Sequence, residues 1–191
     1  YSPVLRSPSF LFNAALCMLA MAVILAYVTA APVQLMVTLG LDMSGFSHWF
    51  TANAALNILA CFLAPRFIAR VGPRRTLRIG LLVLLLSAIT LTLAMHIPHP
   101  LAMMGPVFLS SIGFAMILGA AAGMALAPFG HCAGTAAALL GLFQMSGSGA
   151  LVGITGWLMP DPLSQLALHM WLLLPPLVML MTRQGRRLCL Q

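Results

Sequence analysis

Six long stretches of mostly apolar residues, separated by short polar turns, make up most of this 191-residue chain. A helix needs about 20 consecutive apolar residues to cross the hydrocarbon core of a bilayer. Each of the six stretches reaches that length, so the sequence predicts an all-α membrane protein with six transmembrane helices. The predicted spans are residues 10–31, 46–67, 77–96, 102–127, 134–158 and 164–182.

The composition excludes an ordinary soluble domain. Hydrophobic residues make up 62% of the chain and charged residues only 6%, whereas about 25% of the residues in soluble domains are charged. The net charge of +7 would suggest a nucleic-acid partner in a soluble protein, but the chain has no lysine and its arginines form short clusters beside the spans. Topology and anionic lipid headgroups account for such clusters. We therefore expect membrane lipid, and no nucleic acid, as a partner.

The charged residues divide the loops into two sets. All nine arginines lie on one side of the six-span pattern, and both acidic residues, Asp42 and Asp161, lie on the other. Arginines near a span resist translocation and therefore mark cytoplasmic loops. The pattern predicts a multi-pass protein of a bacterial inner membrane with both termini in the cytoplasm. The arginines are Arg6 before the first span, Arg66, Arg70, Arg74, Arg75 and Arg78 between the second and third, and Arg183, Arg186 and Arg187 after the last.

Prolines and small residues predict where helices end and where they pack. Most prolines, such as Pro32 and Pro65, fall near predicted span ends, because proline lacks an N–H and clashes with the preceding turn. Residues 32–45 are expected to form the longest external loop. Prolines inside spans predict kinks or a bent sixth helix; these are Pro106, Pro175 and Pro176. Small residues at four-residue spacing predict close helix packing or a gliding interface; the pairs are Gly119 and Gly123, Ala137 and Gly141, and Gly149 and Gly153.

Apart from Arg66 and Arg78 at span ends, the predicted spans contain no Asp, Glu, Lys or Arg, although proton and ion pathways normally use such groups. The polar residues at depth are neutral, and they either form hydrogen bonds between helices or line a cavity. They are Asn53, Asn57, Ser110, Ser111, Gln144, Ser146 and Ser148. Flexible methionines beside aromatic residues favour an apolar ligand cavity; they are Met18, Met21, Met116 and Met145, with Phe114 and Phe143.

The cysteines and histidines do not form a recognisable chemical site. The four cysteines and five histidines are too scattered for disulfides or metal ligation, so we expect no metal and no cofactor. Ser146 and Ser148 together with His169 leave an intramembrane serine hydrolase as a remote alternative. The sequence around these serines lacks the Gly-x-Ser-Gly arrangement that resembles rhomboid proteases. We therefore expect no enzymatic activity.

Three segments carry a resemblance to a known family: residues 26–32 (AYVTAAP), 66–78 (RFIARVGPRRTLR) and 127–144 (APFGHCAGTAAALLGLFQ). In this order they resemble the second half of a major facilitator drug transporter, and most closely the Bcr/CflA drug-resistance family. The resemblance implies that the six helices are helices 7–12 of a twelve-helix protein. Since the chain begins at Tyr1 without a methionine, we expect the N-terminal transporter half to be missing from it.

The resemblance also implies a function. Family members are proton-coupled multidrug efflux antiporters that work by alternating access, so the expected partners are small lipophilic drug substrates, protons, and an N-terminal six-helix half or a second copy. The first, second, fourth and fifth helices of such a half line the cavity. The lining candidates are therefore Tyr27, Asn53, Asn57, Phe114, Gln144 and Ser148.

The arginine-rich loop matches a cytoplasmic loop of the family in part. Arg70, Gly72, Arg74 and Arg75 match its pattern, while Ala69 stands where the family has an acidic residue. Within the resemblance, the glycine permits a tight turn and the arginines meet helix ends and carboxylates. A self-sufficient six-helix homodimeric carrier, or a membrane scaffold, remains the alternative function.

Overall fold

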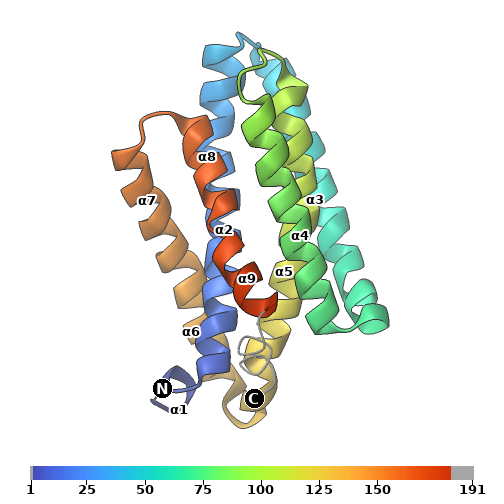
Figure 1. The fold of residues 1–191 in the computed structure, drawn as a ribbon, viewed down its shortest axis with the longest axis vertical. Helices are drawn as coiled ribbons and strands as arrows, with labels where there is room; N and C mark the ends of the chain where they lie inside the picture. Colours follow the sequence, from blue (N-terminus) through green and yellow to red (C-terminus); the bar gives the residue numbers. More distant parts are fainter. Residues whose placement is uncertain (1, 182–191) are drawn as a thin grey trace.

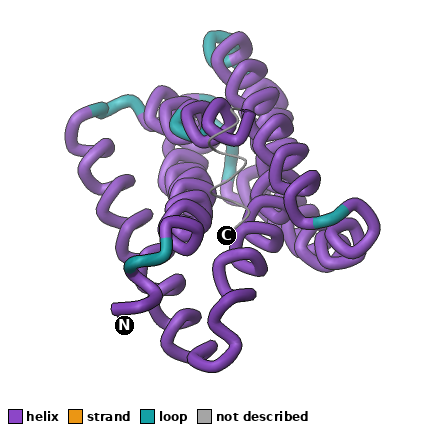
Figure 2. Tube along the Cα trace, turned by 60° about the horizontal axis from the view of Figure 1, so that its bottom comes forward, coloured by secondary structure: helices purple, strands orange, loops and turns teal. Residues whose placement is uncertain are grey.

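The computed structural model describes residues 2–181, and all regular structure in that range is helical (Figures 1 and 2). Arg183, Arg186, Arg187, Cys189 and the last residue of the sixth predicted span lie outside the described residues. The α-helices are α1 (Ser2–Leu5), α2 (Pro8–Pro32), α3 (Met43–Val71), α4 (Pro73–Ala94), α5 (Pro100–Leu126), α6 (Ala133–Leu142), α7 (Ser148–Leu158), α8 (Pro162–Trp171) and α9 (Leu174–Met181). Two π-helices, η1 (Val33–Thr38) and η3 (Phe143–Gly147), and one 3₁₀-helix, η2 (Ala127–Cys132), connect some of them.

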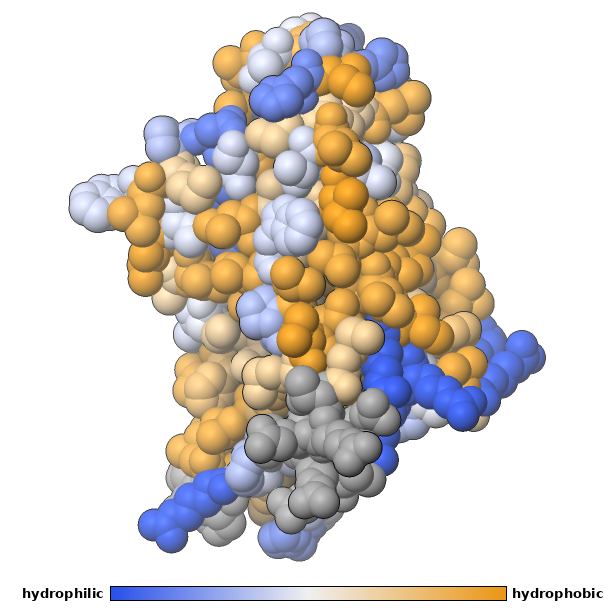
Figure 3. All heavy atoms as spheres, viewed as in Figure 1, coloured by the Kyte–Doolittle hydropathy of each residue, from blue (hydrophilic) through white to orange (hydrophobic). Residues whose placement is uncertain are grey.

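Helix α2 lies between two groups of helices (Figure 1). On one side α2 packs against α5, and α3 and α4 pack against α5 in turn. On the other side α2 packs against α7, η3 and α8. The core along α2 is built from small and aliphatic side chains, among them the fully buried Leu16, Ala20 and Val23. Figure 3 shows hydrophobic side chains over the middle of the visible face and hydrophilic ones gathered toward its ends. This distribution is the one expected of a bundle whose middle is solvated by lipid.

Within residues 2–181, five continuous helical runs are long and apolar enough to cross a membrane, which makes this a multi-pass membrane protein. The run Pro100–Leu158 has 59 residues and would measure about 90 Å if it were straight. It instead turns back through η2, where Phe129 has the non-helical angles φ −110° and ψ 31° (Figure 1). The predicted spans 102–127 and 134–158 are therefore joined through helical turns, which the sequence pattern did not indicate.

The predicted external loop over residues 32–45 is wrong. The chain stays helical through Pro32 and continues as η1 to Thr38, and α3 begins at Met43. Wider turns replace the α-helical pattern, with Leu39 N donating to Gln34 O at 3.0 Å. Val33 and Val37 extend the hydrophobic surface and Leu35 is buried in the core, so the connection shortens to residues 39–42.

The structure confirms some of the helix ends and bends predicted from prolines and contradicts others. Pro65 does not end a helix, because it lies inside α3, which continues to Val71. Pro106 lies inside α5, where the sequence placed it. The bent sixth helix is confirmed, since α8 ends at Trp171 and α9 begins at Leu174, directly before Pro175 and Pro176.

Close helix packing uses different glycines from most of those predicted. A Cβ on Gly113 would lie 2.9 Å from the carbonyl oxygen of Gly80, so the backbones of α4 and α5 touch there. Gly119 also faces a neighbour, Ile68 of α3, at 3.0 Å. By contrast, a Cβ would meet nothing within 4 Å at Gly123, Gly141, Gly149 and Gly153. Four-residue spacing therefore identified only one member of the packed set.

Both acidic residues cap helices. Asp42 accepts a hydrogen bond from Gly45 N at 2.8 Å at the start of α3, and Asp161 accepts one from Ser164 N at 2.8 Å at the start of α8. The hydrogen bonds from Ser164 hold the pKa of Asp161 below its usual value. Both carboxylates therefore satisfy helix N-termini, at the opposite end of the bundle from the turn that joins α3 to α4.

Candidate functional site

A recess of about 310 Å³ lies where α2, α3 and α5 meet, and we call it the polar recess. Four of the six predicted lining residues, Tyr27, Asn53, Asn57 and Phe114, line it together. They come from three different helices, so tertiary packing brings them to one place. Its other lining residues are Met21, Ile24, Val28, Phe50, Ala54 and Ile58.

The amide of Asn53 is held in place by a hydrogen bond between helices. The Ser111 hydroxyl of α5 donates to Asn53 Oδ1 at 2.9 Å, and both residues are buried. Asn53 and Ala64 are the buried residues of α3, most of which is exposed. The Asn53–Ser111 bond joins two helices and holds α3 against α5 beside the recess. The hydrogen bonds of Ser110 and Asn57, by contrast, stay within their own helices.

Aromatic rings form one wall of the polar recess. Tyr27 and Phe50 stack with ring centroids 5.8 Å apart and an interplanar angle of 15°. Phe46, one turn earlier on α3, lies 5.5 Å from Phe50. Sequence analysis missed Phe50, although its spacing from Phe46 and from Asn53 places all three on one helix face. Ring faces and edges offer apolar contact to a planar ligand.

The Tyr27 hydroxyl lies close to the Asn53 side chain, but its geometry satisfies no hydrogen bond to any described residue. The residue is only 3% exposed and lies beside Asn53. An unpaired hydroxyl away from water costs about 1–3 kcal/mol, so such a group calls for an explanation. A ligand that reaches into the recess could supply the missing partner.

Gln144 and Ser148 do not line the polar recess. Gln144 is half-buried in η3, and the buried Ser148 begins α7, where its hydroxyl donates to the carbonyl oxygen of Gln144. The π-helical turn packs against α2, because a Cβ on Gly147 would lie 2.5 Å from Met18 Sδ. Single π-helical turns are frequent at functional sites, but periodicity gave no sign of this one.

His169 does not pair with a serine. Its Nδ1 lies 2.7 Å from Gln165 O, and its Nε2 lies 3.3 Å from Thr155 Oγ1. Since a carbonyl oxygen only accepts, Nδ1 carries a proton toward Gln165. Gln165 Nε2 also donates to Thr155 Oγ1 at 3.0 Å. These bonds join α7 to α8 and occupy the histidine that the hydrolase interpretation requires.

The arginine-rich loop is a one-residue turn. Gly72 has φ +90°, which non-glycine residues rarely adopt. Its N–H donates to Ile68 O at 2.8 Å, and its carbonyl accepts from Thr76 N at 3.0 Å. Pro73 then opens α4, where its missing N–H costs nothing. The turn places Arg70, Arg74 and Arg75 at one end of the bundle.

No metal site is formed by the described part of the chain. In residues 2–181, no group of three or more His, Cys, Asp or Glu side chains could hold a metal ion.

The fold and the polar recess thus define a helical, multi-pass membrane protein with a ligand-sized recess between helices. A sequence profile described as Major Facilitator Superfamily matches residues 1–153. This chain belongs to the Major Facilitator Superfamily.

Its relatives include proteins named Multidrug resistance protein MdtL from Escherichia fergusonii and Shigella dysenteriae serotype 1, each 33% identical to it over 154 residues. The matches cover 78% of this chain and 39% of each relative. The chain therefore spans well under half the length of the curated relatives it matches. No solved structure matches it.

Proposed function

We propose that this chain forms the C-terminal six-helix bundle of a proton-coupled multidrug efflux antiporter of the Bcr/CflA type. The observation that carries the proposal is the polar recess, which joins aromatic and amide side chains in a chain whose relatives are named as multidrug resistance proteins. Substrate sites of such transporters form between two bundles. The chain would then contribute one wall of the drug site and move against its partner to alternate access.

The recess suits small lipophilic drugs. Tyr27, Phe50 and Phe114 offer ring surface, and Asn53 and Asn57 offer neutral hydrogen-bonding groups. Met21 adds a flexible thioether that adapts to varied apolar shapes. Gln144 and Ser148 belong to the same proposal as a separate wall, because the α6–η3–α7 segment lies on the other side of α2 (Figure 1).

Proton coupling in this proposal requires a partner. The predicted spans contain no Asp, Glu or Lys, and their arginines, Arg66 and Arg78, lie at span ends and stay protonated. The coupling carboxylate would therefore lie on an N-terminal six-helix half. A second copy of this chain is the alternative partner and would make a homodimeric carrier or a membrane scaffold.

The proposal includes six membrane crossings, with the run Pro100–Leu158 crossing twice because it turns back at η2. The arginine-rich turn around Gly72 and the N-terminal Arg6 would face the cytoplasm of a bacterial inner membrane. Arg70, Arg74 and Arg75 would meet carboxylates or helix ends of the partner half there. Both termini would be cytoplasmic.

Proton-dependent dye efflux and drug susceptibility in an efflux-deficient bacterium test the proposal. The chain would be expressed alone and together with the N-terminal half of a related transporter. We expect efflux only with the added half, and we expect Phe114→Ala in the recess to reduce it at least fivefold. Phe108→Ala, on the same helix but outside the recess, is the matched control.

Other outcomes assign the chain differently. Efflux by the chain alone would favour the homodimeric carrier. Absence of efflux in both cases, with membrane insertion verified, would contradict a transport function and leave the scaffold. Equal loss of efflux in Phe108→Ala and Phe114→Ala would contradict the placement of the drug site in the polar recess.

A further inference from the structure

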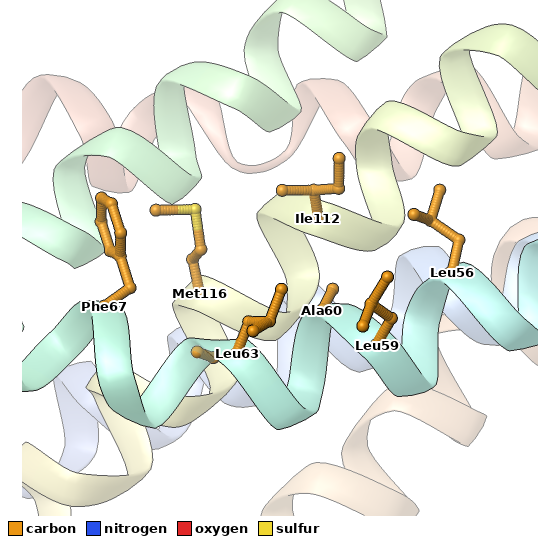
Figure 4. Close-up of a pocket in the computed structure, with 8 residues that line it drawn as sticks. Leu56, Leu59, Ala60, Leu63, Phe67, Ile112 and Met116 are labelled. Atoms are coloured by element: carbon orange, nitrogen blue, oxygen red, sulfur yellow. The ribbon is translucent and has the colours of Figure 1, made fainter.

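A second hollow lies on the other side of the contact between α3 and α5, and we call it the apolar groove. It has a volume of about 270 Å³, and all of its lining side chains are apolar. Figure 4 shows Leu56 and Phe67 of α3 toward opposite ends of the groove, with Ile112 and Met116 of α5 between them along its length. The remaining lining residues are Leu59, Ala60, Leu63 and Ala64.

The apolar groove has the length of one membrane leaflet. Leu56 and Phe67 are 11 positions apart on α3, which corresponds to about 16 Å along a helix. Half of a hydrocarbon core of about 30 Å is about 15 Å. A single acyl chain that lies along α3 therefore matches the groove in length and in chemistry.

The groove ends at two arginines. A smaller recess, lined by Leu63, Arg66, Phe67 and Arg70, shares Leu63 and Phe67 with the groove and continues it toward the α3–α4 turn. Arg66 and Arg70 are one helical turn apart and share a face. The guanidinium carbon of Arg66 lies 4.5 Å from the ring centroid of Phe62, which fixes its position along the helix.

The chain itself supplies no carboxylate side chain for these two arginines. Its acidic residues are Asp42 and Asp161 alone. Asp42 caps the start of α3, 24 positions and about 36 Å from Arg66. Asp161 caps the start of α8 and bonds Ser164. A carboxylate or other anionic partner for Arg66 and Arg70 must therefore come from outside these 191 residues.

We propose that the apolar groove and the arginine pair form a binding site for an anionic phospholipid. One acyl chain lies in the groove between α3 and α5, and the phosphate of the headgroup lies between Arg66 and Arg70. Arginine forms paired hydrogen bonds with phosphate oxygens, and each basic residue near a membrane surface adds to the attraction of an anionic lipid. This site is separate from the polar recess, and of the loop arginines assigned to the partner half it uses Arg70 alone.

Native mass spectrometry of the purified chain tests the proposal with two lipids that share their acyl chains, palmitoyl-oleoyl phosphatidylglycerol and palmitoyl-oleoyl phosphatidylcholine. We expect phosphatidylglycerol to bind preferentially. Arg66→Gln combined with Arg70→Gln should lower its apparent affinity about tenfold. Arg6→Gln combined with Arg75→Gln removes the same charge elsewhere and should change the affinity less than twofold.

A second pair of variants tests the groove. Ala60→Phe fills it and should reduce retention of phosphatidylglycerol severalfold, whereas Ala55→Phe, on the same helix but outside the groove, should not. Soluble glycerol 3-phosphate should not displace the lipid, because it lacks the acyl chain.

Three results would overturn the assignment. The first is equal binding of the two lipids, and the second is equal loss in the two arginine pairs. The third is a dimer mass that disappears in Ala60→Phe, which would assign the groove to a second copy of the chain.

Discussion

The polar recess and the apolar groove lie on the two sides of one helix contact, yet they differ in chemistry. Both are formed by α3 and α5, and the recess also uses α2. The recess contains two asparagines and a buried, unpaired hydroxyl, whereas every lining residue of the groove is apolar. Polar groups within a membrane protein are retained where they bind or join helices. The difference suggests that the recess meets a ligand or partner bundle and that the groove meets lipid.

The two hollows depend on a common wall. Phe114 of α5 faces the recess, while Ile112 and Met116 face the groove. Gly113, between them in sequence, faces α4. The close contact of Gly113 with Gly80 therefore sets the position of the wall that both hollows share.

Gly113→Ala should have the largest effect, because it moves this common wall. The new Cβ would lie 2.9 Å from the Gly80 carbonyl oxygen, a backbone atom that cannot move by itself. We expect a loss of about 1–3 kcal/mol in the free energy of unfolding, measured by denaturation in detergent. Gly141→Ala, where a Cβ meets nothing within 4 Å, should be neutral or stabilising. Equal stabilities would contradict the close α4–α5 contact.

Loss of the hydrogen bond between Asn53 and Ser111 should have the next largest effect on stability. This bond lies at the α3–α5 contact, between the recess and the groove. A double-mutant cycle of Asn53→Leu and Ser111→Ala should give a coupling energy of about 1 kcal/mol. The same cycle with Asn57→Leu in place of Asn53→Leu should give a value near zero, because Asn57 bonds Cys61 on its own helix. Similar couplings in the two cycles would show that the recess has no specific polar link.

Tyr27→Phe should have the smallest effect on stability. It removes a buried hydroxyl that has no partner among residues 2–181, so the free energy of unfolding without ligand should stay unchanged or rise by up to about 1 kcal/mol. Ser87→Ala is the matched control, since the Ser87 hydroxyl donates to Pro106 O at 2.7 Å, and its loss should destabilise the chain. A destabilised Tyr27→Phe variant would mean that the hydroxyl is already paired, and the recess would lose its unsatisfied group.

Much of the helical layout could be predicted, because in a bilayer the helical state of a segment depends mainly on that segment's own residues. Backbone polar groups in lipid must bond within their own segment, so long apolar stretches read directly as helices. The prediction of a loop over residues 32–45 was wrong for the same reason. The apolar residues in that stretch continue the helix as η1, which keeps their backbone groups hydrogen-bonded within the segment. The conformation of a connection between two spans, such as the helical turns of η2, depends on how the spans pack. The hydropathy pattern therefore does not predict it.

The candidate site was predictable only in part. Tyr27, Asn53, Asn57 and Phe114 meet at one recess, whereas Gln144 and Ser148 lie on η3 and α7. The lining residues were predicted from the positions of the helices in the family, which assigns the first, second, fourth and fifth helices to one cavity. It did not predict the π-helical turn at Gln144, which packs against Met18 of α2 through Gly147.

The sequence by itself determined the all-helical membrane class, the separation of arginines from acids, and the resemblance to a transporter family, since these follow from composition and order along the chain. Only the tertiary structure decided that Ser111 holds Asn53, that Tyr27 is left unpaired, and that the apolar groove continues to Arg66 and Arg70. The physical reason is that a helix satisfies its own backbone, whereas side-chain partners come from residues far apart in sequence and depend on which helix faces meet.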